Sequence, residues 1–589
     1  MSQRGVVVIA ANTFGRFMEP MGLHAQFELL TRSSLGASLQ VLDAQCNDRP
    51  LPESYKNERN PMAGYYLETF LKLRGYDARA IFDWSNDDAL LRALKTDPIA
   101  VCLSTTYITD NVLLASCLQH LRKVVGRLPI IVGGPYVWKQ KLQSHSASEL
   151  KQLGLGNRQG MHSIGDQSRQ QALLSEFGID VMADFLFSDD ARQPLKDAIY
   201  IASEFGEHTL LRLLSTLESS RYAAADLLAV PNLVFTRDGS WVMTAEEPEP
   251  VDLDADFTRW DLVDEMPSTV VPLRTSVGCP YRCRYCDFIE IHPTVRMRSP
   301  ASLMTEIGLA RARGSNSFTF IDDNIFLSKA RIGELTKTIL ENEMDITWGG
   351  FFRVDQVDET NIDALWASGC RSGLCGIESF DEKQLARMRK GCRTSEIVRG
   401  IDLCTEKGMW LHLTFIVGFP GETKETLDST AATLQTLNTS TRGWSTGAFF
   451  PLYVIPNTAM DAVDYRRKYN LKGRFTNWSH DTMNYPDAVS VWTPYLFKQV
   501  KNIPMFHGPE YAPKGWTIDR RNRAFTARAE VTTAFLEAKP DDVIQDRFVE
   551  LYQVFREDVP ASEVPVWPTQ LAERRFQAGA VKPLDRLGG

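Results

Sequence analysis

The sequence has no long apolar run, no excess of positive charge and few cysteines for its length. No stretch among its 589 residues approaches the ~18 consecutive apolar residues of a membrane-spanning helix, so we expect no membrane partner. The net charge of −9 argues against a nucleic-acid-binding protein that works through bulk positive charge. Ten cysteines in so long a chain do not make a disulfide scaffold, and we expect thiols or metal ligands.

An export signal and internal repeats are also missing. The apolar run Val6–Ala11 spans only six residues before the polar Asn12 and Thr13, whereas a secretory signal needs about 7–15 apolar residues. We therefore expect a cytoplasmic protein and interpret this run as a buried β-strand. No repeat of solenoid type is visible. At about 100–200 residues per domain, the length predicts roughly three domains.

Strand and helix patterns alternate in the first part of the chain. Buried strands are predicted at 6–11, 78–82, 99–104 and 129–132, and helices at 61–74, 87–95 and 111–125. This order predicts an open, mostly parallel sheet with helices on both faces, a Rossmann-like domain over residues 1–140. Residues 141–260 are predicted as an insertion and linker. Their polar stretch 139–195 favours a surface elaboration over a functional lid, and residues 233–244 predict a hairpin turning at Asp238-Gly239.

The alternation becomes regular from Val271 to Phe450. Six strands are predicted, at 271–277, 317–322, 346–354, 371–379, 410–418 and 444–450, with helices between them. An α/β fold with six such units predicts a (β/α)6 partial TIM barrel over residues 261–454, whose chemistry belongs at the carboxyl ends of the strands.

Residues 455–589 are predicted as an α-rich C-terminal domain that determines the substrate. Its aromatic residues suit either a ligand pocket or a core that closes the barrel mouth, and we favour the core; they are Trp478, His480, Tyr485, Trp492 and Tyr495. Four arginines between Arg520 and Arg528 indicate a basic helix face, for which a solvated surface is favoured over a clamp for an anionic substrate.

The most specific motif follows the first barrel strand. Cys279, Cys283 and Cys286 stand in the spacing Cys-x3-Cys-x2-Cys, which can place three thiolates on three corners of a 4Fe–4S cluster. The fourth iron then has no protein ligand and can chelate the amino and carboxylate groups of a substrate. The alternative is a structural zinc site completed by His292, but zinc sites usually draw on two ligand pairs and no second Cys-x2-Cys is present. The other cysteines of the barrel lack cluster spacing and are expected to be buried, with Cys375 a weak candidate for the lumen.

This motif, with an aromatic residue before its last cysteine, resembles the signature of the radical-SAM enzymes, which use a 4Fe–4S cluster to cleave S-adenosylmethionine (SAM). The resemblance implies that Asp322 and Asp323, with Asn324, bind the SAM amino group, where the family often has Gly-Gly-Glu. It implies further SAM contacts from Tyr285 (nucleobase), Arg353 (carboxylate), Glu378 and Ser379 (ribose), and Gly418 with Pro420 and Gly421 (adenine). Helix caps and turns are the alternative roles for the acidic residues and the glycines.

The N-terminal sheet resembles the cobalamin-binding fold. The residues that carry this resemblance are Ser104, Thr105 and Thr106 after one strand, and Gly133, Gly134 and Pro135 after the next. Small residues let the backbone approach a bulky planar ring. No histidine follows the first strand until His24, so we expect no histidine below the cobalt, and residues 58–66 are candidates for that face. The alternative is a Rossmann-like domain that binds nothing and only packs on the barrel.

Together these domains resemble the cobalamin-dependent radical-SAM enzymes over residues 1–450. The resemblance implies a C-methyltransferase that carries a methyl group from SAM, via methylcobalamin, to an unactivated carbon of a small-molecule or natural-product intermediate. It also implies an external reductant of flavodoxin or ferredoxin type. The main alternative is ring rearrangement, cyclisation or oxidation by the same cofactors without methyl transfer. A methylation of an sp2 carbon without hydrogen abstraction is another branch, and a zinc-stabilised binding protein is the alternative from a different class.

Overall fold

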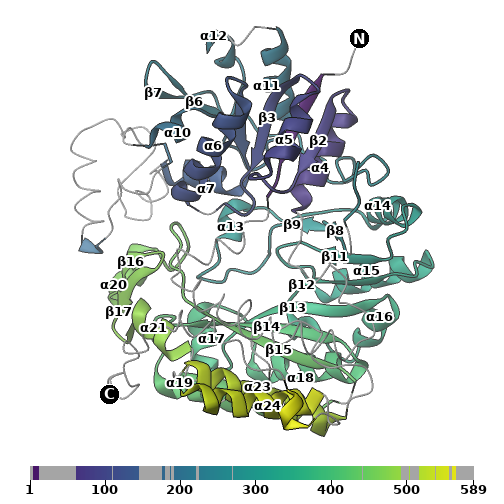
Figure 1. Cartoon of the computed structure of the whole chain (residues 1–589), viewed down its shortest axis with the longest axis vertical. Coiled ribbons are helices and arrows are strands. Elements are labelled where there is room, and N and C mark those ends of the chain that lie inside the picture. Colours follow the sequence, from purple (N-terminus) through teal and green to yellow (C-terminus); the bar gives the residue numbers. More distant parts are fainter. Residues whose placement is uncertain are drawn as a thin grey trace.

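The computed structural model describes most of the chain in two large sheet-based parts. The described residues are 4–11, 61–108, 110–144, 176–178, 186–187, 191–219, 224–267, 270–440, 442–492, 500, 503, 517–536, 539–555 and 560–564. Figure 1 shows the N-terminal sheet at one end of the molecule and the second sheet below it. Predictions on residues 12–60 and on most of 145–190, including His24, lie outside the described residues.

The N-terminal part is a seven-stranded sheet in the order β2-β1-β3-β4-β5-β6-β7. Its first five strands pair in parallel, and β6 and β7 add an antiparallel hairpin. The strands are β1 Gly5–Ile9, β2 Asp77–Ile81, β3 Pro98–Ser104, β4 Ile130–Gly133, β5 Ile199–Ile201, β6 Leu233–Arg237 and β7 Ser240–Met243. The helices are α4 Met62–Lys72, α5 Asp87–Leu94, α6 Asn111–Val125, α7 Pro135–Ser144, α10 Gln193–Lys196, α11 Glu207–Ser219 and α12 Ala224–Leu227.

Local sequence explains these elements. Strands β1 and β3 are buried along their whole length, as continuous apolar runs in a parallel sheet should be. The Asp110 side chain caps α6 by accepting from Leu113 N at 2.8 Å, and the helix ends at Gly126, whose φ is 61°. The predicted hairpin turn is present, with positive φ at both Asp238 and Gly239.

The predicted boundary at residue 140 needs a correction. Strands β5, β6 and β7 belong to the same sheet as β1–β4, so the N-terminal domain continues to Met243. Strand β5 is only three residues long and two of them are buried, so it gives no strand pattern that stands out in the sequence.

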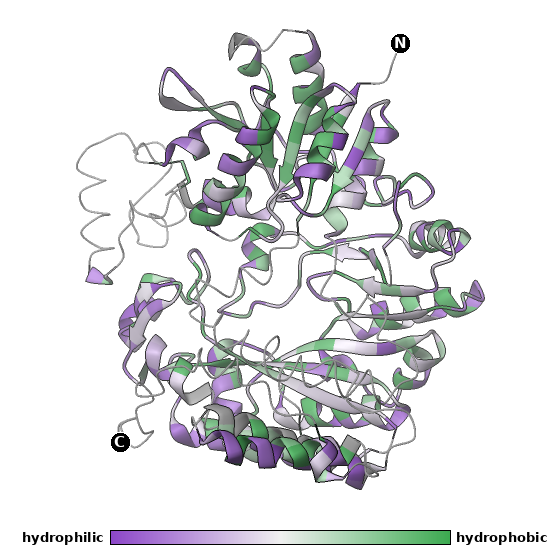
Figure 2. Cartoon of the chain, viewed as in Figure 1, coloured by the Kyte–Doolittle hydropathy of each residue, from purple (hydrophilic) through white to green (hydrophobic). Residues whose placement is uncertain are grey.

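The second part is a six-stranded parallel sheet in the order β15-β14-β13-β12-β11-β8. This is the predicted (β/α)6 partial barrel. Its strands are β8 Val271–Leu273, β11 Ser317–Phe320, β12 Thr347–Phe351, β13 Cys370–Glu378, β14 Trp410–Val417 and β15 Trp444–Pro451. Its helices are α13 Phe288–Ile291, α14 Pro300–Ala312, α15 Lys329–Glu341, α16 Ile362–Ala367, α17 Glu382–Met388, α18 Thr394–Lys407 and α19 Lys424–Leu434, with the 3-10 turn η3 Val354–Gln356. In Figure 2, which colours the ribbon by hydropathy, hydrophobic residues are most prominent in the strands of the N-terminal sheet.

The first predicted barrel strand is broken. After β8 the chain leaves the sheet and forms β9 Ser276–Val277, which pairs with β10 Arg296–Met297 instead. The cause is Asp322, whose carboxylate accepts from Thr275 N at 2.7 Å and Ser276 N at 2.5 Å, so these amides are not available to a neighbouring strand. The break places the cysteine loop directly after β9.

The C-terminal part contains helices and an unpredicted three-stranded antiparallel sheet. Its elements are α20 Val463–Tyr469, β16 Lys472–Arg474, β17 Asn477–His480, β18 Met483–Asn484, α21 Tyr485–Trp492, α23 Ile518–Leu536, α24 Asp541–Phe555 and η5 Ala561–Glu563. Trp478, His480 and Tyr485 are buried, as the core interpretation predicts. Arg520 holds α23 to α24 through Val554 O, and Arg523 pairs with Asp519.

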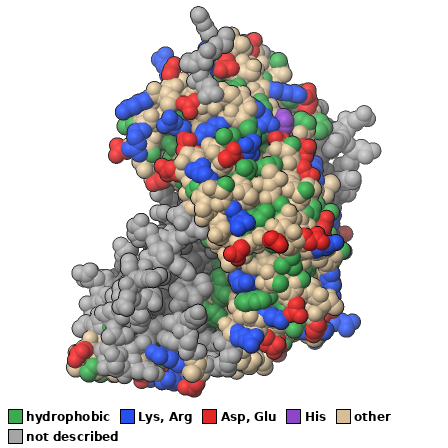
Figure 3. Space-filling model, turned by 90° about the vertical axis from the view of Figure 1, so that its right-hand side faces the viewer, with side chains coloured by type: hydrophobic (Ala, Val, Ile, Leu, Met, Phe, Trp, Pro, Cys, Tyr) green, Lys and Arg blue, Asp and Glu red, His purple; other side chains and the backbone are tan. Residues whose placement is uncertain are grey.

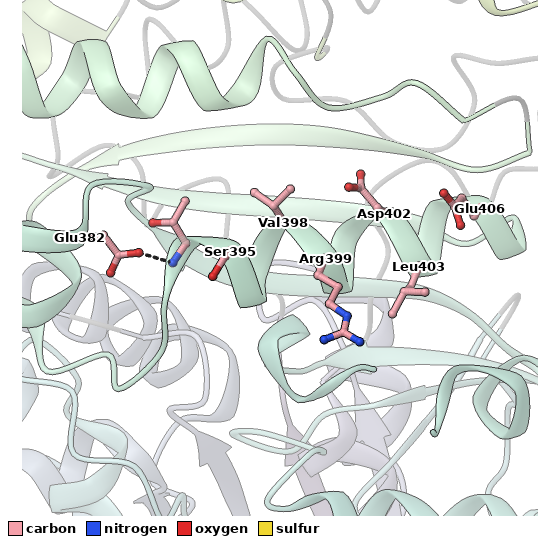
Figure 4. Close-up of a pocket in the computed structure, with 8 residues that line it drawn as sticks. Glu382, Ser395, Val398, Arg399, Asp402, Leu403 and Glu406 are labelled. Atoms are coloured by element: carbon pink, nitrogen blue, oxygen red, sulfur yellow. Dashed lines mark hydrogen bonds between the residues drawn. The ribbon is translucent and has the colours of Figure 1, made fainter. Parts of the chain in front are cut away.

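The described helices include none long and apolar enough to cross a membrane. Positive and negative side chains intermingle over the face drawn in Figure 3. An open depression of about 640 Å³ lies along the outer face of α18, next to Val398, Arg399 and Asp402 (Figure 4). None of the predicted site residues lines this depression, so it does not belong to the site described next.

Candidate active site at the cysteine loop

The cysteine loop is anchored to the barrel at both its start and its middle. Gly278 has a φ of 82°, and its amide donates to Asp323 Oδ2 at 2.9 Å. A Cβ at Gly278 would lie 3.1 Å from two backbone oxygens, so the turn requires glycine. In the middle of the loop, Arg284 N donates to Met388 O at 2.9 Å, and Met460 N donates to Arg284 O at 3.0 Å.

All three loop cysteines are free thiols in a largely buried environment. Burial raises the pKa of Cys279, and it raises that of Cys286 to about 12. Sulfurs with such a pKa become thiolates at neutral pH when a metal binds them. In the described part of the chain no three His, Cys, Asp or Glu side chains are close enough to hold one metal ion.

His292 does not serve the zinc alternative. Its Nδ1 lies 3.1 Å from Glu204 Oε1, a residue of the N-terminal domain, and its ring packs on Phe205. The imidazole therefore bridges the two domains.

Arg353 has the features expected of a residue that binds an anionic group. It is 6% exposed and follows β12. Its Nη2 pairs with Asp355 Oδ2 at 3.0 Å, and its guanidinium lies 3.9 Å from the centre of the Tyr281 ring, within the cysteine loop. Its Nε and Nη1 are buried with no hydrogen-bond partner among the described residues. Buried donors without partners are costly, so these two atoms fit the predicted contact with the SAM carboxylate.

The acidic pair at the end of β11 holds the backbone. Asp322 is 4% exposed, and burial raises its pKa to about 6. Both of its carboxylate oxygens accept hydrogen bonds, from the Thr275 and Ser276 amides and from Thr275 Oγ1. Asp323 accepts from Gly278 N. In the structure Asp322 fixes the strand before the cysteines and Asp323 holds the Gly278 amide, and the contact with the SAM amino group stays a prediction.

Glu378 joins the cysteine loop to the end of β13. It has a φ of 70°, and strain of this kind in a residue other than glycine is often found at functional sites. Its Oε1 accepts from Tyr285 Oη at 2.9 Å and from Lys390 Nζ at 3.2 Å, and Lys390 Nζ also lies 3.3 Å from Tyr285 Oη. The sequence analysis did not single out Lys390. Lys390 is only 5% exposed and lies close to the cysteine loop in space, but neither its burial nor this proximity is visible in the sequence.

Ser379 and Gly418 lie against other parts of the protein. Ser379 is 1% exposed, and its hydroxyl lies 3.2 Å from Thr430 Oγ1 on α19. Gly418, with a φ of 88°, would place a Cβ 2.6 Å from the Trp478 ring, and its carbonyl lies 2.9 Å from His480 Nε2. Glycine at position 418 thus leaves room for the Trp478 ring of the C-terminal part. The neighbouring Gly421 O accepts from Arg387 Nη1 at 2.7 Å.

The two predicted cobalamin segments meet at the carboxyl edge of the N-terminal sheet. Thr105 N and Thr105 Oγ1 both donate to Gly133 O, at 2.8 and 2.9 Å. A Cβ at Gly134, whose φ is 110°, would lie 2.9 Å from Thr105 Oγ1. Thr106, Gly134 and Pro135 are exposed at this edge, and Ser104 Oγ lies 3.0 Å from Thr106 Oγ1. The strand order puts the switch point of the sheet between β1 and β3, directly beside this edge, and doubly wound folds bind ligands at such a point. The small residues here would let a planar ring approach the backbone.

The two candidate regions are in direct contact. Helix α7 begins at Pro135, and α13 begins two residues after Cys286. Trp138 Nε1 on α7 donates to Ile291 O on α13 at 3.2 Å, and Lys139 pairs with Asp287. In Figure 1, α13 lies between the two sheets. Helix α7 follows the loop that ends at Gly134, and α13 follows the loop that carries the cysteines. The contact between these two helices therefore connects the two loops.

Comparisons with known proteins agree with this geometry. Residues 273–434 match the model of the Radical SAM superfamily. The chain carries a radical-SAM domain. It is similar to OxsB, a cobalamin-dependent S-adenosylmethionine radical enzyme solved with aqua-cobalamin and S-adenosylmethionine bound. That match covers 100% of this chain and 84% of OxsB, with a TM-score of 0.54 and 12% identity. The predicted resemblance is confirmed at the level of the domain and the fold.

Two curated relatives have different activities in their names. One is the anaerobic magnesium-protoporphyrin IX monomethyl ester cyclase of Rubrivivax gelatinosus, 25% identical over 43% of this chain and 48% of the relative. The other is an uncharacterized methyltransferase of Pyrococcus horikoshii, 24% identical over 44% of this chain and 59% of the relative. The chain thus spans about half the length of the curated relatives it matches.

Proposed function

We propose that the chain is a cobalamin-dependent radical-SAM C-methyltransferase that acts on an unactivated carbon of a small molecule. The observation that carries this proposal is the contact between α7 and α13, made by Trp138 with Ile291 and by Lys139 with Asp287. It connects the edge of small residues at Gly133–Pro135 to the loop of three cysteines. A domain for a methyl carrier and a domain for radical chemistry would then face one substrate.

The protein's own residues have separable tasks in this proposal. Cys279, Cys283 and Cys286 would hold the 4Fe–4S cluster, which supplies the electron for SAM cleavage. Arg353 would bind the SAM carboxylate through its free Nε and Nη1, and Asp323 would remain beside the amino group. Tyr285 would be kept in place by Glu378. Ser104–Thr106 and Gly133–Pro135 would carry cobalamin. An external low-potential protein, of flavodoxin or ferredoxin type, would supply the electron.

The second candidate function is cyclisation or rearrangement without methyl transfer. The cyclase among the relatives favours it, since that protein is as similar to this chain as the methyltransferase is. Counting the products of SAM separates the two. Methyl transfer to an unactivated carbon yields one S-adenosylhomocysteine and one 5′-deoxyadenosine per product, and methyl-deuterated SAM labels the product with all its methyl deuterons. A cyclase yields 5′-deoxyadenosine without matching S-adenosylhomocysteine, and that result would overturn the methyltransferase proposal. S-adenosylhomocysteine alone would indicate methylation of an sp2 carbon without a radical.

A further inference from the structure

A buried lysine lies between the cysteine loop and the barrel wall. Lys390 is 5% exposed and follows α17, where its amide donates to Leu385 O at 3.0 Å. Its ammonium group reaches Glu378 Oε1 and Tyr285 Oη, one on β13 and the other between the second and third cysteines. Lysine is almost never buried without a partner, because an ammonium loses strong hydration. The position of this charge is therefore specific.

The barrel strand leaves room for this group. A Cβ on Gly376 would lie 2.4 Å from Glu378 Oε1 and 3.3 Å from Lys390 Nζ. The positive φ of Glu378 turns its carboxylate back toward Gly376, where the strand carries no side chain. The glycine at position 376, the positive φ of Glu378 and the charge of Lys390 together form one small polar cluster, which consists of Tyr285, Glu378 and Lys390.

Lys390 keeps its positive charge next to the cysteines. Burial lowers the pKa of Lys390, but the Glu378 carboxylate raises it, and on balance the pKa is above its ordinary value. Glu378 accepts from Lys390 and from Tyr285 through the same oxygen, Oε1. A cluster on the three cysteines gains one negative charge when it is reduced, and a fixed cation beside it favours that state.

We propose that Lys390 is a positioning residue that sets the reduction potential of the cluster, both by its charge and by holding Tyr285 against Glu378. This inference rests on the proposed function, because it presupposes the cluster. It adds a residue outside the cysteine motif whose removal makes the cluster harder to reduce. No bond is made or broken in this role, and the single electron comes from the low-potential donor.

The test compares Lys390→Met with Lys390→Arg and with a matched control. Lys383→Met removes the same charge from the same segment, because Lys383 is an exposed residue of α17. Midpoint potentials are measured by anaerobic titration with dithionite and redox mediators, followed by the electron paramagnetic resonance signal of the reduced cluster, without SAM. We expect Lys390→Met to lower the midpoint potential of the cluster by at least about 59 mV, which is a tenfold change in the one-electron reduction equilibrium. Lys390→Arg and Lys383→Met should stay close to the unchanged protein.

Each outcome decides the proposal. Equal potentials for Lys390→Met and the unchanged protein would overturn it, as would an equal shift in Lys383→Met. If Lys390→Met fails to retain iron, Glu378→Gln replaces it. That variant removes a negative charge and must make reduction easier, and an unchanged potential would overturn the role of the polar cluster. A failure of the proposed function is distinguishable, because the unchanged protein would then show no reducible cluster at all.

Discussion

The Lys139 ammonium on α7 pairs with the carboxylate of Asp287, the residue directly after the third cysteine. Asp287 is 8% exposed, so its carboxylate lies largely buried beside this partner. The ion pair links the helix that follows Gly134 to the helix that follows the cysteines. This ion pair helps to fix the distance between the two candidate cofactor regions. A substitution of either partner is therefore expected to disturb that distance.

We predict that Lys139→Met lowers the free energy of unfolding by about 1–3 kcal/mol, because it leaves a largely buried carboxylate unpaired. Asp287→Asn in the same background should restore part of that loss. Both are measured by denaturant unfolding of the protein without cofactors. The control is Lys329→Met, which breaks an exposed pair with Asp358 and should cost at most about 1 kcal/mol. Equal losses at Lys139 and Lys329 would remove the argument for a special contact.

Arg353→Ala should weaken SAM binding by roughly tenfold to a hundredfold. The reason is the loss of charge-assisted hydrogen bonds from two buried donors that have no other partner in the described chain. Equilibrium dialysis of SAM against cluster-loaded protein measures the affinity, and the iron content shows that the cluster remains. Arg399→Ala, which removes an exposed partner of Glu359, is the control. Unchanged affinity in Arg353→Ala would assign the free donors to another ligand.

Gly134→Ala should reduce the cobalamin content of the protein. The added Cβ meets Thr105 Oγ1 at 2.9 Å, and the φ of 110° is unfavourable for any side chain. Gly75→Ala is a matched control, because Gly75 also has a positive φ, 91°, with nothing within 4 Å of a Cβ. Both variants should lose about 1 kcal/mol or more of stability, but only Gly134→Ala should lose cobalt. Equal cobalt in the two variants would argue against this edge as the cobalamin site.

Glu422 predicts a pH dependence of stability. Burial raises its pKa to about 8, although Gly418 N donates to its Oε2 at 2.5 Å. A carboxyl group whose pKa is raised on folding stabilises the protein below its unfolded pKa, and this contribution is lost as pH rises through its folded pKa. The unchanged protein should therefore lose stability between about pH 4.5 and 8 relative to Glu422→Gln. Denaturant unfolding of both proteins across this range measures the difference. If the free energy of unfolding of the unchanged protein stays constant or rises relative to that of Glu422→Gln as the pH increases, the assignment is contradicted.

Local patterns predicted much of the fold and the core of the site. The cysteine spacing lies within one loop, and the alternation of apolar strands with helices is visible without tertiary contacts. Ser379 was harder to place, because the register shift between Gly376 and Glu378 and the positive φ of Glu378 turn the next side chain toward α19. Strand alternation alone cannot reveal such a bulge.

Long-range contacts explain the other differences. Lys390 lies 105 residues from Tyr285, and Trp138 lies 153 residues from Ile291, so neither contact leaves a pattern in the sequence. Asp322 looked like a ligand because it ends a barrel strand. Its structural role depends on the break between β8 and β9, which is not visible in the continuous strand predicted over residues 271–277.

The metal content of the purified protein tests the central claim most directly. The protein is made with hydroxocobalamin available and purified without oxygen, and iron and cobalt are counted per chain. We predict about four irons and about one cobalt in the unchanged protein. The triple variant of Cys279, Cys283 and Cys286 to alanine should lose the iron and keep the cobalt, because the two groups are held by different domains. Iron retained in the triple variant, or no cobalt in the unchanged protein, would contradict the account.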